Sequence, residues 1–283
     1  MKKITPLIAA VGLFLSACAA VPNQQPEEQR DGLTFIHLND TYRVGAVEDG
    51  KRGGFSRAIS LVRELQAQGR DVRVLHGGDF LYPSLESSLW DGLQMVDAMN
   101  FLNAIAPLYV TSGNHEFDRR RPKQLVAAIK ASDFVWLGDN YTFRTGDEVA
   151  DRALQSAFTF EHDGKTIGVF SLTLHAFDGG NVRDYLEVDR DYKAVAEKTI
   201  VELENRGVDM IIGVTHLLMW KDVEIAGLKA AHPKLAFIVG GHDHEPQYSP
   251  ASETSALVMK GASNARVIWQ IDPTAMAVTG TLF

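Results

Sequence analysis

The most informative stretch of this sequence is Gly113-Asn114-His115-Glu116-Phe117-Asp118. It closely follows the apolar run Leu108–Thr111, which has the length and residue types of a buried strand. An amide, an imidazole and two carboxylates are therefore gathered in one loop after a strand. Ligands of open α/β sheets bind beyond the carboxyl ends of the strands, so this loop is a candidate functional site.

Four further apolar runs end in polar clusters in the same way. They are Leu33–Leu38 before Asn39-Asp40-Thr41-Tyr42, Val72–Leu75 before His76-Gly77-Gly78-Asp79, Met210–Val214 before Thr215-His216, and Leu235–Val239 before Gly240-Gly241-His242-Asp243-His244. Because the carboxyl ends of parallel strands lie at one edge of a sheet, we expect the five clusters to converge.

Longer segments with apolar residues at helical spacing separate these strands, and this alternation predicts an α/β fold. The helical segments are 55–65, 95–102, 125–129 and 192–205. Near the end of the sequence, Ala256–Lys260 and Val267–Ile271 flank a short polar segment with a glycine, which predicts a hairpin.

The composition excludes several classes of protein. With 283 residues, 45% hydrophobic and 23% charged, the chain is neither disordered nor a polytopic membrane protein. The formal net charge of -8 argues against a polynucleotide partner, because neutralising phosphates requires a basic surface. A small anionic substrate remains compatible with this charge if metal ions supply the positive charge.

Together the five clusters supply carboxylates, an amide oxygen and imidazoles, but no thiolate. This donor set suits Mn²⁺, Zn²⁺ or Fe ions better than Ca²⁺ alone or a structural zinc site. Each cluster alone is weak support, since a histidine after a strand is more often a hydrogen-bonded core or surface residue. Their joint occurrence, each after a strand, favours a metal site over an incidental polar rim.

The order of these clusters resembles that of the calcineurin-like metallophosphoesterase superfamily, most closely the catalytic domain of bacterial 5′-nucleotidases. The resemblance runs from about Phe35 to Ile271, includes Gly53-Gly54-Phe55, and is most specific at Gly113 to Asp118. It implies a four-layer α-β-β-α sandwich with two mixed sheets, and a catalytic domain that occupies residues 32–283.

The resemblance also implies a role for each site residue. The first metal ion would be bound by Asp40, Asp79 and His244, and the second by Asp79, Asn114, His216 and His242. His115 would be the catalytic residue and Asp118 would orient it. Glu116 and Asp243 are expected to support the ligands rather than to bind metal.

The implied reaction is hydrolysis of a phosphoester. Two divalent or mixed-valence ions about 3.5 to 4 Å apart can clamp a phosphoryl group and provide a metal-bound hydroxide at neutral pH. His115 can stabilise the equatorial oxygens or protonate the leaving group. The expected substrates are small phosphomonoesters such as nucleotides. The alternatives are a phosphodiesterase on the same core, or a catalytically silent metal- or phosphate-binding lipoprotein.

The first cluster departs from the family pattern, which has Asp-x-His where this chain has Asp40-Thr41-Tyr42. Three interpretations are open. Tyr42 packs or hydrogen-bonds beside the site, Tyr42 coordinates as a phenolate, or Tyr82 fills the position. The third interpretation rests on Gly78-Asp79-Phe80-Leu81-Tyr82, which resembles the Gly-Asp-x-x-Tyr motif of purple acid phosphatases. Family 5′-nucleotidases also carry a nucleobase-stacking C-terminal domain, so nucleotide specificity stays open for a sequence that ends at Phe283.

The N-terminus has the features of an export signal. Lys2 and Lys3 precede an apolar run, and residues 1–17 are expected to form the signal peptide. Leu15-Ser16-Ala17-Cys18 resembles the lipobox of bacterial lipoproteins, which predicts lipidation of Cys18 and a flexible tether over residues 18–31. The expected location is a bacterial membrane, namely the outer membrane facing the periplasm. The alternative is a plain secretory signal that is cut after residue 19 or 20.

Overall fold

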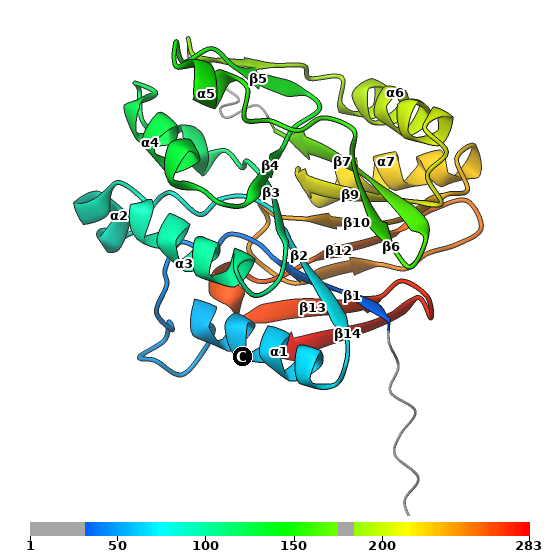
Figure 1. The fold of residues 1–283 in the computed structure, drawn as a ribbon, viewed down its shortest axis with the longest axis horizontal. Helices are drawn as coiled ribbons and strands as arrows, with labels where there is room; N and C mark the ends of the chain where they lie inside the picture. Colours follow the sequence, from blue (N-terminus) through cyan, green and yellow to red (C-terminus); the bar gives the residue numbers. More distant parts are fainter. Residues whose placement is uncertain (1–31, 175–183) are drawn as a thin grey trace, which may run out of the picture.

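The computed structural model describes residues 32–174 and 184–283, which form two stacked β-sheets with helices on both outer faces (Figure 1). The predicted signal peptide, Cys18 and the tether lie outside the described residues. Within the described ranges no helix combines the length and the apolar character needed to cross a bilayer.

Both large sheets are mixed, as predicted. The first has the order β14 (Ala277–Leu282), β13 (Val267–Asp272), β1 (Leu33–Leu38), β2 (Asp71–His76), β3 (Leu108–Thr111) and β4 (Val135–Leu137). The second has the order β11 (Gln247–Ser249), β12 (Leu257–Lys260), β10 (Leu235–Gly240), β9 (Met210–His216), β7 (Lys165–Thr173) and β6 (Phe158–His162). A separate ribbon pairs β5 (Tyr141–Phe143) with β8 (Leu186–Val188). The five strands expected before the polar clusters are all present, and within each sheet they run parallel.

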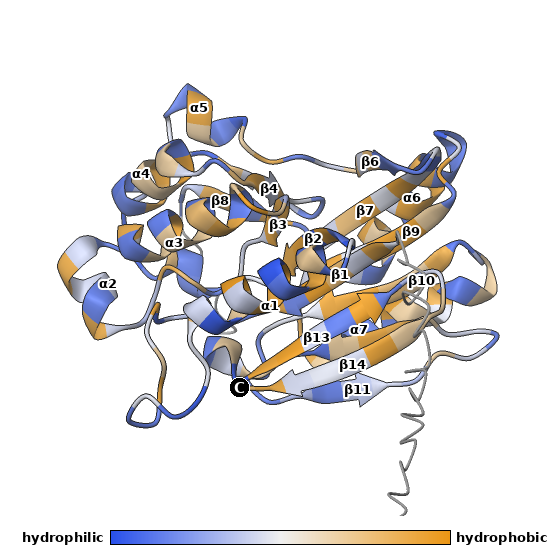
Figure 2. Cartoon of the chain, turned by 60° about the horizontal axis from the view of Figure 1, so that its bottom comes forward, coloured by the Kyte–Doolittle hydropathy of each residue, from blue (hydrophilic) through white to orange (hydrophobic). Residues whose placement is uncertain are grey.

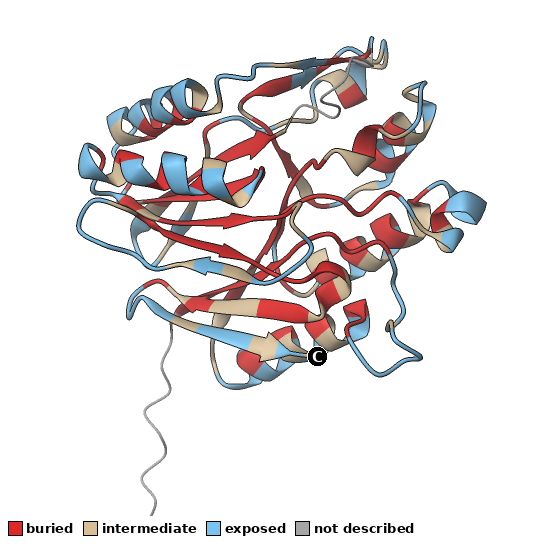
Figure 3. Cartoon of the chain, turned by 180° about the vertical axis from the view of Figure 1, so that it is seen from behind, coloured by how far each residue is buried: buried red, intermediate tan, exposed pale blue. Residues whose placement is uncertain are grey.

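Helices cover the outer face of each sheet. They are α1 (Phe55–Ala67), α2 (Leu85–Trp90), α3 (Leu93–Asn103), α4 (Lys123–Ala131), α5 (Glu148–Asp151), α6 (Tyr192–Asn205) and α7 (Met219–Ala226). Buried residues of α1, α3 and α4 pack on the first sheet, and those of α6 and α7 pack on the second. The predicted four-layer sandwich is therefore confirmed, with the outward helix faces exposed and the central strands buried (Figure 3).

Strand β1 shows how the sequence specifies these layers. Successive residues of a strand point to opposite faces. Phe35 accordingly packs between the two sheets, where its ring centroid lies 5.5 Å from that of Phe237. Ile36 points the other way, into the core beneath the helices. Because both faces of the strand are covered, it is apolar along most of its length, as Figure 2 shows for the central strands.

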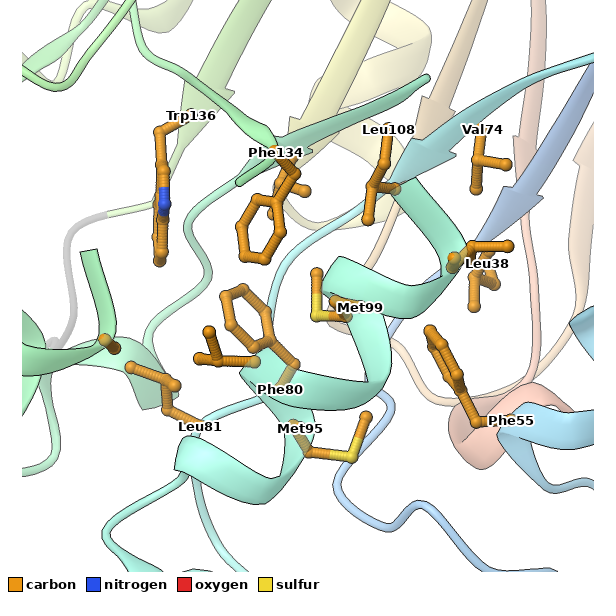
Figure 4. Packing of buried hydrophobic residues seen from close by; sticks show 14 of the residues in the cluster. Leu38, Phe55, Val74, Phe80, Leu81, Met95, Met99, Leu108, Phe134 and Trp136 are labelled. Atoms are coloured by element: carbon orange, nitrogen blue, oxygen red, sulfur yellow. The ribbon is translucent and has the colours of Figure 1, made fainter. Parts of the chain in front are cut away.

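The core beneath α3 fixes the loop after β2. Met95 and Met99 of α3 pack in one cluster with Phe80, Phe134 and Trp136 (Figure 4). Phe80 has no exposed surface and directly follows Asp79 in the sequence. Burial of this ring therefore anchors the loop that presents Asp79 to the site.

The predicted hairpin near the chain end is wrong. β12 pairs with β10 and β11 in the second sheet, whereas β13 pairs with β1 and β14 in the first. The chain crosses between sheets at Gly261, whose N–H donates to the Asn39 side chain at 2.8 Å. The two apolar runs were compatible with a hairpin, but each run pairs instead with a central strand of a different sheet, β12 with β10 and β13 with β1. β13 instead forms its hairpin with β14.

Candidate metal centre and catalytic dyad

The site lies where the carboxyl ends of strands from both sheets meet. β1, β2 and β3 of the first sheet and β9 and β10 of the second all end there. The approach is so close that a Cβ atom on Gly241 would lie 2.3 Å from the Gly77 carbonyl oxygen. A Cβ on Gly113 would lie 2.2 Å from Asp79 Oδ1. These glycines are required because no side chain fits between the loops.

Asp40, Asp79 and His244 form the first group of candidate ligands, with one ligand atom of each lying within 4.8 Å of the others. Asp40 Oδ1 is 3.1 Å from His244 Nε2, while its Oδ2 accepts the Asn39 side-chain amide at 2.6 Å and the His242 backbone N–H at 2.9 Å. Asp79 Oδ1 similarly accepts a backbone N–H, that of His115, at 2.7 Å. Each carboxylate thus uses one oxygen to hold its loop and turns the other toward the centre.

Asn114, His216 and His242 form the second group. Asn114 Oδ1 lies 3.2 Å from His216 Nε2 and 3.1 Å from His242 Nδ1. His216 Nδ1 donates to the Gly77 carbonyl at 2.6 Å, which leaves Nε2 to face the site. His216 Nε2 is also 3.3 Å from Asp79 Oδ2, so Asp79 belongs to both groups. The structure therefore brings together all six residues for which metal binding is predicted.

The backbone is unusual at four of these six positions. Asp40, Asp79, His242 and His244 have φ values of 53°, 61°, 83° and 60°, in the left-handed region that side chains seldom adopt. Such conformations persist only where surrounding contacts enforce them, and they concentrate at functional sites. The sequence pattern gave no sign of this feature.

The buried aspartates and histidines of the site shift one another's pKa values. Burial alone would raise the pKa of Asp40, but the hydrogen bond from His244 and the charge of His216 hold it well below its usual range. Burial lowers the pKa of His216, yet the charges of Asp79 and Asp40 outweigh burial and raise it to about 9. Burial and the charge of His216 lower the pKa of His242 to about 4.

The donor atoms fit divalent metal ions. His216 Nε2 faces two acceptors, Asn114 Oδ1 and Asp79 Oδ2. In the metal-free chain its raised pKa supplies a proton between them, and without that proton all three atoms are acceptors. A cation among these atoms removes that conflict, and a mixture of nitrogen and oxygen donors suits Mn, Zn or Fe ions.

His115 and Asp118 form the predicted pair beside this centre. His115 lies in the short helix η1 (His115–Phe117), and its Nδ1 is 3.0 and 3.1 Å from the two Asp118 oxygens. Burial lowers the pKa of His115, but the hydrogen bond to Asp118 and the charge of Asp79 outweigh burial and raise it. The side chain of His115 remains 30% exposed, so a substrate can reach it.

Glu116 has the supporting position expected of it. Its buried carboxylate accepts backbone N–H groups from the loop after β2 and from the loop after β3. These donors belong to Asp79 at 2.9 Å, Phe80 at 2.8 Å, Leu81 at 3.1 Å and Gly113 at 2.5 Å. Glu116 therefore fixes the two loops that carry Asp79 and Asn114 relative to one another.

Lys260 is a functional candidate that the sequence analysis missed. Its ammonium group is fully buried and lies 2.6 Å from Asp243 Oδ2 and 3.0 Å from Asp222 Oδ2. It also donates to the Gly241 carbonyl at 2.9 Å, next to His242. The one feature of the sequence that could have pointed to Lys260 is its position at the end of the apolar run of β12, directly before Gly261.

Tyr42 lies at the first group of candidate ligands, whereas Tyr82 lies away from it. The Tyr42 hydroxyl contacts Asp40 Oδ1 at 3.1 Å, Asp79 Oδ2 at 3.1 Å and His244 Nε2 at 2.8 Å. Burial and the two carboxylates raise its pKa far above the usual value. The Tyr82 ring instead lies against the guanidinium of Arg119, whose Cζ is 4.5 Å from the ring centroid.

A family model for calcineurin-like phosphoesterase matches residues 33–246, so the chain belongs to the calcineurin-like phosphoesterase family. It is 32% identical over 264 residues to a 5′-nucleotidase of Vibrio vulnificus, an alignment that covers 86% of this chain and 46% of the relative. It is 24% identical over 253 residues to a 2′,3′-cyclic-nucleotide 2′-phosphodiesterase/3′-nucleotidase of Haemophilus influenzae, covering 82% of this chain and 38% of the relative. The chain thus spans less than half of these curated relatives.

A solved structure shows the same fold. The 5′-nucleotidase precursor from Thermus thermophilus superposes with a TM-score of 0.72 at 22% sequence identity, and the match covers 88% of this chain and 53% of that one. The resemblance to calcineurin-like phosphoesterases and to bacterial 5′-nucleotidases is confirmed at the level of the family.

Proposed function

We propose that this chain is a dinuclear metal-dependent hydrolase of small phosphomonoesters such as nucleotides. One observation carries most of the proposal. Asp79 Oδ2 lies 3.3 Å from His216 Nε2 of the second group and 3.1 Å from the Tyr42 hydroxyl, which also contacts Asp40 Oδ1 and His244 Nε2 of the first group. A single carboxylate oxygen is thus shared by two groups of ligands, as expected for a pair of neighbouring cations. The similarity to 5′-nucleotidases supports a nucleotide substrate.

The candidate ligands and the His115–Asp118 pair would have separate roles in this reaction. Asp40, Asp79 and His244 would hold one ion, and Asn114, His216 and His242, with Asp79, the other. When bound, such ions neutralise phosphoryl oxygens and activate water. His115, with Nδ1 held by Asp118, presents Nε2 as the proton donor to the leaving oxygen or as a hydrogen bond to a phosphoryl oxygen. The hydrogen bond to Asp118 and the charge of Asp79 raise the pKa of His115, which favours its protonated form.

The test is an assay of residues 19–283 reloaded separately with Mn²⁺, Zn²⁺ and Fe ions, on a panel of phosphomonoesters and phosphodiesters. We expect metal-dependent turnover that falls by about 10² or more in His115→Ala, the usual effect of losing a positioned proton donor. The metal content of the variant should match that of the parent protein. If no ion gives turnover above that of the variant, the chain is a silent metal- or phosphate-binding protein.

A phosphodiesterase is the second candidate, because one relative carries both activities in its name. The same panel separates the two. Monoester turnover well above diester turnover supports the first proposal, and the reverse order supports the second.

We also propose that the protein is exported and anchored by lipid on Cys18 to a bacterial membrane, the outer membrane facing the periplasm. The lone cysteine at the lipobox position supports this proposal. Expression of the full chain and of Cys18→Ser, followed by membrane fractionation and mass spectrometry of the mature N-terminus, tests it. A mature protein that begins after residue 19 or 20 without lipid would show a plain secretory signal.

A further inference from the structure

We infer that Tyr42 provides a phenolic oxygen ligand to the cation held by Asp40, Asp79 and His244, where the family pattern has an imidazole. This inference rests on the proposed metal centre and deepens it. It changes the donor set of one of the two ions from nitrogen toward oxygen.

The distances around the Tyr42 hydroxyl fit a ligand position. Its oxygen lies 3.1 Å from Asp40 Oδ1, 3.1 Å from Asp79 Oδ2 and 2.8 Å from His244 Nε2. Asp40 Oδ1 and His244 Nε2 are themselves 3.1 Å apart. Adjacent ligands of an octahedral ion with bonds of about 2.1 Å are separated by about 3 Å, which is √2 times the bond length. The phenolic oxygen therefore lies at the spacing of a neighbouring ligand from one atom of each of the three residues, and Asp40 Oδ1 and His244 Nε2 lie at that spacing from each other.

The hydrogen of the Tyr42 hydroxyl is shared between two acceptors. The Tyr42 hydroxyl has a single hydrogen, but two carboxylate oxygens compete for it at the same distance of 3.1 Å. In the metal-free chain, His244 Nε2 at 3.1 Å from Asp40 and His216 Nε2 at 3.3 Å from Asp79 can supply further hydrogens to these buried carboxylates. When the two imidazoles bind metal through Nε2, those hydrogens are no longer present. A cation bound by the phenolic oxygen and both carboxylates satisfies all of these acceptors at once.

The ring of Tyr42 is held in the orientation that ligation requires. It is 8% exposed and is packed edge-to-face between His115, at a centroid distance of 5.8 Å, and His244, at 5.6 Å. The preceding residue, Thr41, is fixed by a 2.7 Å hydrogen bond to His76. The hydroxyl therefore points at the ligand group without an additional ordering cost.

The other tyrosine does not compete for this position. Tyr82 is packed in the core beneath α3 and against Arg119. Its polar neighbours are Arg119 and Asp91 rather than the candidate ligands Asp40, Asp79 and His244 that surround Tyr42. Tyr82→Phe is therefore a matched control that removes one phenol oxygen without touching the ligand group.

Without a metal ion, burial and the two carboxylates keep Tyr42 as the neutral phenol, and a bound cation would replace its proton. The phenol O–H bond breaks, the oxygen–metal bond forms from the phenolate electron pair, and the proton leaves to the buffer. No oxidant or reductant takes part, because the iron used below is added as Fe³⁺.

The test loads the full chain with Fe³⁺ and records its visible spectrum beside its iron content. A phenolate bound to Fe³⁺ gives a ligand-to-metal charge-transfer band, so the parent protein and Tyr82→Phe should be coloured. Tyr42→Phe should lose the band. Tyr42→His should be colourless while it retains the metal content of the parent. A fully iron-loaded parent without the band, or a band that survives in Tyr42→Phe, overturns the inference.

Zn²⁺ affinity, measured by competition with a chelator, gives a second readout if the chain does not take up Fe³⁺. Tyr42→Phe should lower the affinity of one of the two sites by about 10-fold or more, and Tyr42→His should restore it. Equal affinity in the parent and Tyr42→Phe overturns the inference while leaving the metal centre intact. A parent protein that binds neither ion would instead refute the proposed function.

Discussion

The side chain of Glu116 accepts the backbone N–H of Asp79 at 2.9 Å, so one buried carboxylate sets the backbone of another. The same Glu116 oxygen also accepts the N–H of Gly113, in the loop that carries Asn114. Because Asp79 and Asn114 come from different strands, this contact fixes the spacing between two candidate ligands. Position 79 is also held at a positive φ, which needs such external enforcement.

Replacement of Glu116 by glutamine should therefore damage both stability and metal binding. An amide has one acceptor oxygen and turns N–H groups toward backbone donors, so we expect a loss of about 2 to 3 kcal/mol in the free energy of unfolding. Zn²⁺ affinity should fall by about 10- to 100-fold. Urea unfolding and chelator competition measure the two effects. Glu197→Gln, at an exposed position of α6, is the control and should change neither. Parent-like values for Glu116→Gln would contradict the supporting role.

The pair formed by Asp118 and His115 predicts a shift in the pH profile of turnover. Asp118 helps to raise the pKa of His115, so Asp118→Asn should lower that pKa. If His115 acts as a proton donor, activity declines as pH rises through its pKa, and the decline in Asp118→Asn should begin at lower pH than in the parent. The measurement is kcat/KM across pH with constant metal. Asp97→Asn, on the exposed face of α3, should leave the profile in place, and an unmoved profile in Asp118→Asn would show that Asp118 does not tune His115.

Much of the fold could be predicted because its central strands are buried on both faces. Runs such as Leu33–Leu38 are therefore nearly continuous apolar segments, which the polar clusters terminate clearly. The helix Tyr192–Asn205 has the predicted bounds, since Asp191 caps it and its apolar stripe is regular. Helices α2 and α5, of six and four residues, are too short to show a helical period.

The remaining features depend on long-range contacts. The strands β12 and β13 look alike in sequence, and only their partners decide that they enter different sheets. The clusters located the candidate site and the family resemblance named its residues, but neither predicted the left-handed backbone at Asp40 or His242, because both depend on contacts between loops. Lys260 was missed for the same reason, since its two carboxylate partners are distant in the sequence.

Lys260 should be essential for stability because its ammonium group neutralises two carboxylates. Lys260→Met leaves Asp222 and Asp243 without their cation, and breaking a buried ion pair in this way costs about 3 to 5 kcal/mol. Burial already raises the pKa of Asp222, although Lys260 opposes this rise.

The double variant Lys260→Met/Asp222→Asn should recover part of the loss, because it removes one unpaired charge. Urea unfolding of both single variants and the double variant gives their coupling energy. Lys198→Met, at an exposed position of α6, controls for loss of a lysine. Strictly additive effects of the two substitutions would show that Lys260 and Asp222 do not stabilise one another.

The burial of His37 predicts that the free energy of unfolding falls in mild acid. It lies fully buried between the sheets, with Nδ1 3.1 Å from the Leu75 carbonyl and Nε2 3.0 Å from the Gly240 carbonyl. Burial lowers its pKa from 6.5 to about 4, so the folded state resists protonation that the unfolded state accepts. The stabilising contribution is therefore complete above about pH 6.5 and is lost as the pH falls toward 4.

Between about pH 7.5 and about pH 5, the parent should lose about 2 kcal/mol more unfolding free energy than His37→Gln. Urea unfolding in the presence of a chelator, which removes the pH dependence of metal binding, measures this difference. Equal losses in the two proteins would mean that His37 titrates alike in the folded and unfolded chain.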